Sequence, residues 1–280
     1  MKKLFFVLLL SVVAILNLTA QDDDWRYILS STIPQGGIEA KIFNNLYTQQ
    51  TGPGEGILVD RATFFTTSVS FLYGVGNRFN AGFDVRFRGV RYDALPASPF
   101  KVLSFEDAAN TRSGITSLGP KVRFAPFTSI PKLSVQSAFL LAIGDDLSGT
   151  NGKNYIDWDG STWLTQVFND FSIGSQFALF GEVDFLLEDI GTDRLNRFST
   201  PLTAIFSYFP TKNVTLYGLA GYSPYWQDDF DYFAQAGVGA KYQFSKQFEI
   251  ELLYTYFTNE YLQFIDGKAA TFNIGFRYSK

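Results

Sequence analysis

The sequence contains no cysteine and no histidine. The lack of cysteine excludes disulfides, zinc–thiolate sites, thiol nucleophiles and a lipidated N-terminal cysteine. The lack of histidine removes the usual general base, the commonest metal ligand and the ordinary Ser-His-Asp triad. We therefore predict that the protein is not an enzyme, and that it has no catalytic residues, no cofactor and no metal site.

Long apolar runs are also scarce, because no run of membrane-spanning length follows the apolar stretch at the N-terminus. Lys2 and Lys3 precede the apolar residues 4–16, and this run ends near Ala20. The pattern predicts a signal peptide over residues 1–20. The alternative is an uncleaved anchor, for which the run is short of the required length of about 20 residues. Residues 21–36 are then expected to form a periplasmic N-terminal segment.

The chain has no excess of basic residues, with 23 Lys and Arg against 27 Asp and Glu, so we expect no nucleic-acid partner. What is abundant is aromatic residues, at 18%, and glycine. The apolar residues follow a period of two. In residues 79–89 one set faces one way (Phe79, Ala81, Phe83, Val85, Phe87) and a polar set faces the other (Asn80, Asp84, Arg86, Arg88). This alternation is typical of strands with an apolar and a polar face.

Segments of this kind recur about twelve times along the chain, and most are long enough to cross a bilayer as tilted strands. Their expected spans are 37–49, 61–74, 78–91, 114–125, 132–143, 162–172, 175–187, 199–209, 212–222, 231–244, 247–257 and 268–279. Short links alternate with long ones, and the long links fall at 50–60, 92–113, 144–161, 188–198, 223–230 and 258–267. Pro120 and Pro201 each remove a ladder donor, so each marks either a bulge or an error in the expected boundary.

These features predict an all-β fold, a transmembrane antiparallel up-and-down β-barrel of about twelve strands over residues 37–280. An even number of strands places both termini on the side of the short turns, which is the periplasm in bacterial barrels. The expected location is the cell outer membrane, and the expected partners are its lipid and lipopolysaccharide. A soluble periplasmic β-protein is the alternative, but such a protein has no reason to place its long loops on one side.

The polar face is expected to line the lumen. The candidate selectivity residues are Asp84, Arg86, Arg88, Lys121, Arg123, Glu182, Asp184, Glu249, Glu251 and Arg277. The basic members lie mostly on the third and fourth strands, and the acidic members on the seventh and eleventh, which predicts a basic wall facing an acidic wall. In the alternative, these charges pair and keep a filled interior polar. Twelve strands lie between the small filled barrels and the open porins, so the sequence leaves both readings open.

The leading hypothesis for function is a channel or transporter-like barrel for small molecules. The alternative is a structural or adhesion barrel with an occluded lumen, whose outer loops 145–160 or 223–230 bind a ligand, a cation or a partner. A third hypothesis is an enzyme that uses carboxylates such as Glu249 and Glu251. Their spacing of two residues follows more simply from the polar-inward alternation.

Two segments resemble a known group of proteins: residues 43–49 (FNNLYTQ) and residues 115–126 (ITSLGPKVRFAP). They look like segments of outer-membrane barrels from Bacteroidetes-type bacteria. Those barrels are in turn similar to the transporter-like (MetA-like) barrels of the phenol meta-degradation pathway. The resemblance implies the passage of small, hydrophobic molecules across the outer membrane, and it implies that Pro120 is tolerated in the barrel.

Overall fold

The fold is known from a computed structural model, which describes residues 30–50, 61–94, 97–106, 108–130, 132–143, 160–192, 195–257 and 269–280. The predicted signal peptide and nearly all of loop 145–160 lie outside these residues, as do residues 21–29 of the expected N-terminal segment. No helix within the described ranges is long and apolar enough to cross a membrane.

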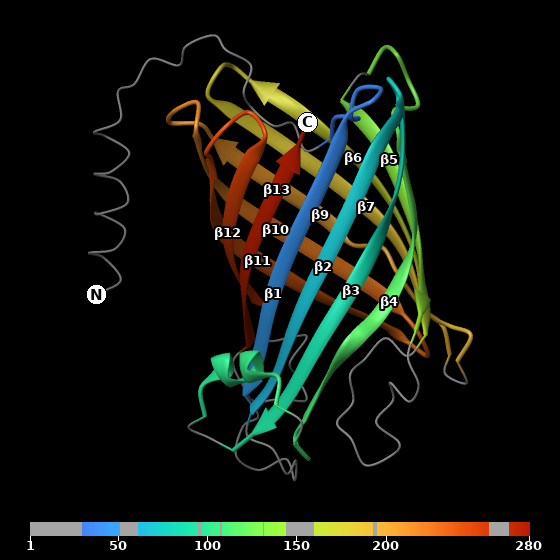
Figure 1. Ribbon diagram of the computed structural model, residues 1–280, viewed down its shortest axis with the longest axis vertical. Helices are drawn as coiled ribbons and strands as arrows, with labels where there is room; N and C mark the ends of the chain where they lie inside the picture. The colour runs from blue at the N-terminus through green and yellow to red at the C-terminus, as the bar shows by residue number, and fades with distance from the viewer. Residues whose placement is uncertain are drawn as a thin grey trace.

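Antiparallel strands form a closed ring (Figure 1). They are β1 Ile38–Gln50, β2 Arg61–Gly76, β3 Phe79–Asp93, β4 Thr111–Phe124, β5 Leu133–Ala142, β6 Ser161–Ile173, β7 Phe177–Ile190, β8 Arg197–Ser199, β9 Leu202–Tyr208, β10 Val214–Trp226, β11 Phe230–Gln243, β12 Phe248–Phe257 and β13 Ala269–Ser279. A short 3-10 helix, η1, spans Pro99–Ser104. Because β1 pairs with β13, the sheet has no edge. The predicted all-β antiparallel barrel is therefore confirmed.

The strands β8 and β9 together make one strand of the barrel, because both lie between β7 and β10. Thr200 and Pro201 separate them. The chain stays bonded at the break: the Asp184 N–H donates to the Pro201 carbonyl at 2.8 Å, and the Thr200 N–H donates to the Pro224 carbonyl at 3.1 Å. Pro201 thus interrupts the eighth strand without opening the barrel, and the prediction of twelve barrel strands is confirmed.

The second proline, Pro120, lies inside β4. It pairs with Phe83 on β3, but the ladder to β5 passes from Leu118 directly to Lys121. Its neighbour Gly119 faces a close approach of β5, because a Cβ at this position would lie 1.7 Å from the Phe139 carbonyl oxygen. Pro120, which has no backbone N–H, and Gly119, which has no side chain, therefore lie together at the place where β4 and β5 make no ladder bonds.

Two of the links predicted to be long are short. Strands β10 and β11 remain paired up to Trp226 and Phe230, so three residues connect them. The expected loop 223–230 was wrong because most of it continues the paired strands, with Trp226 and Phe230 on the outer face of the wall. There the Trp226 ring packs against Phe230 at 5.6 Å and against Phe198 at 5.8 Å. The link expected at 188–198 is reduced in the same way, since β7 ends at Ile190 and β8 begins at Arg197.

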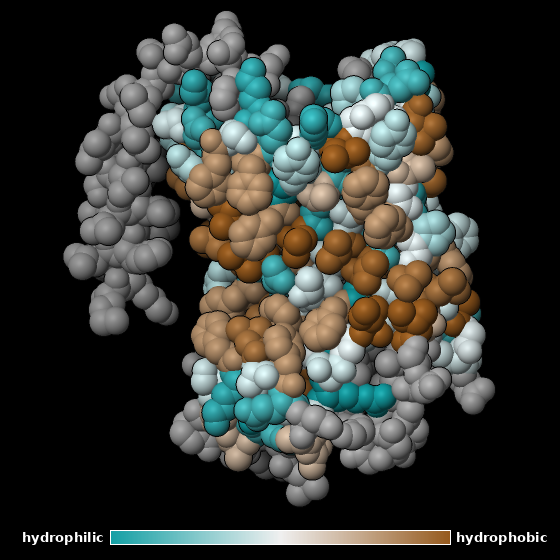
Figure 2. Space-filling view, in the orientation of Figure 1, coloured by the Kyte–Doolittle hydropathy of each residue, from teal (hydrophilic) through white to brown (hydrophobic). Residues whose placement is uncertain are grey.

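The outer face of the barrel is apolar. Val238 is 67% exposed, Leu252 55% and Phe206 49%, although a soluble protein would bury such side chains. Figure 2 shows the apolar residues as a belt around the middle of the visible wall, with hydrophilic residues near both ends. A closed barrel with an apolar belt of this kind is suited to a bilayer, where the belt contacts the acyl chains.

Candidate functional site

The inner face of the wall carries every predicted lumen residue. Asp84, Arg86, Arg88, Lys121, Arg123, Glu182, Asp184, Glu249, Glu251 and Arg277 all belong to the inward-facing set of their strands, and each is buried or half-buried. The apolar residues between them are mostly exposed on the outer face. The alternation gives each of these residues a face, but it does not say which of them meet.

The predicted separation into a basic and an acidic wall is wrong for the two glutamates of β12. Glu249 pairs with Arg277 on β13 at 3.5 Å, and Glu251 pairs with Lys241 on β11 at 3.4 Å. Glu251 also accepts a hydrogen bond from the Tyr217 hydroxyl. The sequence suggested opposite walls because it gives each residue a face but no neighbour, whereas the register places each glutamate beside a cation on an adjacent strand.

The basic residues of β4 also have acidic neighbours. Lys121 lies 2.9 Å from Asp84 on β3. Arg123 lies 3.5 Å from Glu39, which is also 3.2 Å from Lys41. In a low-dielectric interior, the attraction between paired charges offsets part of the desolvation cost that an isolated buried charge would carry uncompensated. The half of the lumen near the short turns is thus lined by local ion pairs.

A hydrogen-bonded chain of side chains connects Arg123 with the acidic pair on β7. The Arg123 guanidinium donates to Gln136 at 3.0 Å, Gln136 donates to Gln166 at 2.8 Å, and Gln166 donates to Asp184 at 3.3 Å. These residues lie on four consecutive strands, β4 to β7. Glu182 precedes Asp184 on the same face, and neither takes part in an ion pair between residues that the structure describes.

The end of the N-terminal segment lies inside the barrel at the short-turn end. The Ser30 N–H donates to Asp170 at 2.8 Å, and its carbonyl accepts from the Ser134 hydroxyl. The Ile33 N–H donates to the Asn80 Oδ1 at 2.9 Å, and the Asn80 amide nitrogen donates back to the Ile33 carbonyl at 2.8 Å. The segment therefore follows the inner wall from β6 to β3, and Ser30, Asn80 and Ser134 have no exposed surface.

The close fit of this segment continues to β2. A Cβ at Gly74 would lie 1.9 Å from the Pro34 carbonyl oxygen, and the Gly36 N–H donates to the Gly74 carbonyl at 2.8 Å. No pattern in the sequence predicts these contacts, because the segment is irregular. The inward alternation identifies Asn80 and Asp170 as lumen residues without naming their partner.

The opposite, long-loop end of the lumen carries a row of aromatic rings. Tyr92, Phe64 and Tyr47 face inward on β3, β2 and β1, and Phe257 and Phe233 do so on β12 and β11. The centroid of the Tyr47 ring lies 5.9 Å from that of Phe64 and 5.8 Å from that of Phe257. The Phe64–Tyr92 and Phe233–Phe257 distances are 6.3 and 5.8 Å. We call these five residues the aromatic row.

One cation lies against the aromatic row. The Arg88 guanidinium is 4.9 Å from the centroid of the Phe64 ring, within the range of a cation–π contact. Aromatic residues in a membrane barrel are expected mainly on the lipid face, so this row was not among the predicted lumen residues. The sequence nevertheless indicates this row, because Phe64 and Phe257 stand at the same alternating positions as the inward-facing polar residues of their strands.

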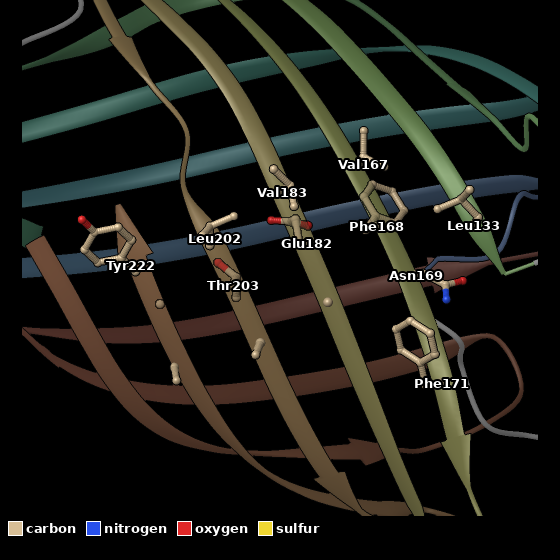
Figure 3. A pocket seen from close by; sticks show the side chains of 14 residues that line it. Leu133, Val167, Phe168, Asn169, Phe171, Glu182, Val183, Leu202, Thr203 and Tyr222 are labelled. Atoms are coloured by element: carbon tan, nitrogen blue, oxygen red, sulfur yellow. The ribbon is translucent and has the colours of Figure 1, made fainter. Parts of the chain in front are cut away.

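Two hollows lie in the wall itself. The first, of about 540 Å³, is lined by residues of β5, β6, β7, β9 and β10, whose labelled side chains are spread along the strands (Figure 3). It is lined by outward-facing Val183, Leu202 and Phe171, and it is deep where Gly181 and Ala204 carry little bulk. The second, of about 710 Å³, has a similar apolar lining that includes Phe206, Val238 and Leu252. Both open on the lipid-facing side, so neither is a solute path along the lumen.

No protein-family model and no curated protein matches the sequence. The fold does have solved relatives. The COG4313 outer membrane channel from Pseudomonas putida F1 superposes with a TM-score of 0.64 and 13% identity, over 91% of this chain and 99% of that one. The beta domain of the Bordetella autotransporter BrkA gives a TM-score of 0.56 and 13% identity, over 87% of this chain and 99% of that chain.

The translocator domain of the autotransporter NalP from Neisseria meningitidis gives a TM-score of 0.50 and 11% identity, over 86% of this chain and 88% of that one. At these identities the likeness concerns the fold. The fold of this chain is that of an outer-membrane channel barrel, and its closed wall and apolar belt place it in the outer membrane.

Proposed function

We propose that the protein is a channel for small molecules, and that its solutes are apolar or aromatic compounds that carry a polar or anionic group. The aromatic row inside the long-loop end carries this proposal. Rings about 6 Å apart offer faces on which a flat apolar solute packs, and Arg88 beside Phe64 supplies a hydrogen-bond donor and a positive charge for the polar group.

The solved fold relatives support a passage function in general, since the first of them is an outer membrane channel. The proposal includes kinship with the Bacteroidetes-type barrels and with the transporter-like barrels of phenol meta-degradation, which the two sequence segments suggest. It also includes cleavage of residues 1–20, and an orientation with both termini in the periplasm and the long loops outside, among lipopolysaccharide.

A second candidate is a structural or adhesion barrel with a closed lumen. The observation that favours it is the filling of the short-turn end by the ion pairs and by residues 30–34. That the protein is not an enzyme stays a prediction. Glu249 and Glu251, the carboxylates considered for acid–base chemistry, each have a cation as a neighbour.

Efflux from proteoliposomes tests the channel. We expect the barrel to release small aromatic acids faster than sugars of similar size, because sugars gain little from the rings. Replacing Phe64 by Ala is expected to slow the release of the aromatic acid and to leave that of the sugar unchanged. Phe206→Ala is the matched control, since it removes the same ring from the lipid-facing side.

Folding is checked in each sample by heat-modifiable migration in detergent gels. A folded wild-type barrel that releases neither solute and shows no conductance in planar bilayers would reject the channel and favour the structural barrel. Equal release of aromatic acids and sugars would support a channel but would reject the proposed class of solute.

A further inference from the structure

The link between β3 and β4 contains the 3-10 helix η1, Pro99–Ser104, which lies outside the barrel wall (Figure 1). The helix has defined ends. The Ser98 side chain accepts a hydrogen bond from the Phe100 N–H at 3.3 Å, and the Phe105 N–H closes the other end on the Val102 carbonyl at 3.4 Å. This part of the link therefore has a defined conformation.

One side of η1 packs on the outer wall. Val102 is 4% exposed and approaches the place where a Cβ on Gly89 would stand to within 3.7 Å, so the missing side chain of Gly89 makes room for it. The Phe105 ring lies between the outward-facing rings of Phe65 and Phe87, with centroid distances of 5.9 and 5.5 Å. These contacts fix the helix against β2 and β3.

Phe105 accepts an unusual backbone conformation to make this contact. Its φ of 49° is in the left-handed region, which costs a residue with a Cβ roughly 1–2 kcal/mol. The strain is tolerated because the bend turns the ring back onto Phe65 and Phe87. The salt bridge from Arg91 on β3 to the following residue Glu106, at 3.2 Å, holds the chain as it leaves the wall.

The other side of η1 is apolar and uncovered by the described residues. Phe100 is 57% exposed and Leu103 42%, and the Phe100 ring lies 6.3 Å from Phe272, a lipid-facing residue of β13. Phe105, which follows the helix, is 46% exposed even with one side of its ring against Phe65 and Phe87. This surface is thus continuous with the apolar belt. Lys101 and Ser104, on the same short helix, are exposed and polar.

We infer that η1 is a membrane foot: an amphipathic element that inserts Phe100 and Leu103, beside the exposed edge of Phe105, among the lipid acyl chains of the leaflet on the long-loop side. Lys101 then reaches the headgroups. Such elements lie about 5–10 Å below the headgroup boundary, with their charged residues directed to water. The occupant of this surface is lipid, because the surface extends the belt that already contacts acyl chains.

The foot gives the barrel an anchor that aromatic girdles on the strands do not supply. It lies on the outer face of β2 and β3, next to Leu46 of β1, which pairs with Phe65 and is 4% exposed although it points toward the membrane. It therefore shields the strands next to the β1–β13 closure and fixes the depth of the long-loop end in the bilayer.

Single-cysteine labelling tests this inference, since the chain has no native cysteine. A nitroxide is attached to Leu103→Cys in the full barrel in lipid nanodiscs, and its collisions with oxygen and with a water-soluble nickel chelate are measured by electron paramagnetic resonance. Val238→Cys, on the mid-wall, and Asp228→Cys, in the exposed β10–β11 turn, are the lipid and water references.

We expect the ratio of oxygen to nickel collisions at Leu103 to lie between the two references and nearer to that of Val238. Adding Val102→Asp, which removes the contact with Gly89, should shift the ratio toward the value of Asp228. A ratio at Leu103 equal to that of Asp228 overturns the inference. Low collision rates with both reagents also overturn it, because they indicate that protein, not lipid, covers the foot.

Discussion

The contact between Asn80 and Ile33 predicts how the short-turn end is closed. Asn80 makes two hydrogen bonds with the backbone of Ile33, at 2.9 and 2.8 Å, and has no exposed surface. The substitution Asn80→Ala removes both bonds and leaves a buried N–H and carbonyl without these partners. Each such loss costs about 1–2 kcal/mol, so docking of the segment weakens by about 2–4 kcal/mol. At 1.4 kcal/mol per factor of ten, the population with the segment released rises about 30-fold to about 700-fold.

Single-channel recording in planar bilayers measures this effect. We expect Asn80→Ala to spend more time in a state of higher conductance than the wild type, and deletion of residues 22–34 to make that state permanent. Asn169→Ala is the control. It is an asparagine on the outer face, and its Oδ1 has no hydrogen-bond partner in the part of the chain that the structure describes. If the deletion variant folds and conducts like the wild type, the segment does not close the lumen and the reasoning fails.

Two further substitutions test the wall and its ion pairs. Gly119→Ala would place a Cβ 1.7 Å from the Phe139 carbonyl oxygen, so we expect a sharp fall in the heat-modifiable, folded fraction, whereas Gly114→Ala, with open space around it, should fold normally. Arg277→Ala leaves Glu249 buried without its cation, which is expected to cost about 3–5 kcal/mol, seen as a lower midpoint of unfolding in urea. Lys101→Ala, which removes an exposed cation from outside the wall, is the control; equal midpoints for the two variants would contradict the prediction.

The barrel could be predicted from the sequence because each strand repeats one physical rule over ten or more residues. Phe83, Val85 and Phe87 must meet lipid while Asp84, Arg86 and Arg88 must avoid it, and a shift of one residue would reverse every side chain on the strand. The strand count and the inward residues follow from this rule. The strand ends at Trp226 and Phe230 did not follow, because aromatic residues near a proline are compatible with a loop as well as with a girdle.

The partners of the inward residues could not be predicted, because a period of two specifies a face and says nothing of rotation around the barrel. Arg123 and Glu39 lie on β4 and β1, far apart in sequence, and meet because both project into the same part of the lumen. Phe64 follows the inward rule as strictly as Arg88 does. It was not among the predicted lumen residues, because only the polar members of the inward-facing set were chosen as candidates.

The lumen divides into two chemically different halves, and the division bears directly on function. The short-turn half is lined by ion pairs and by residues 30–34, whose contacts a passing solute would disturb. The long-loop half carries rings, which hold apolar solutes by contact area and release them without breaking a charged network. A solute that enters by the rings must therefore displace the segment or pass beside it. In the proposed channel, the aromatic row therefore selects which molecules enter, while Asn80 and its neighbours set how often they pass.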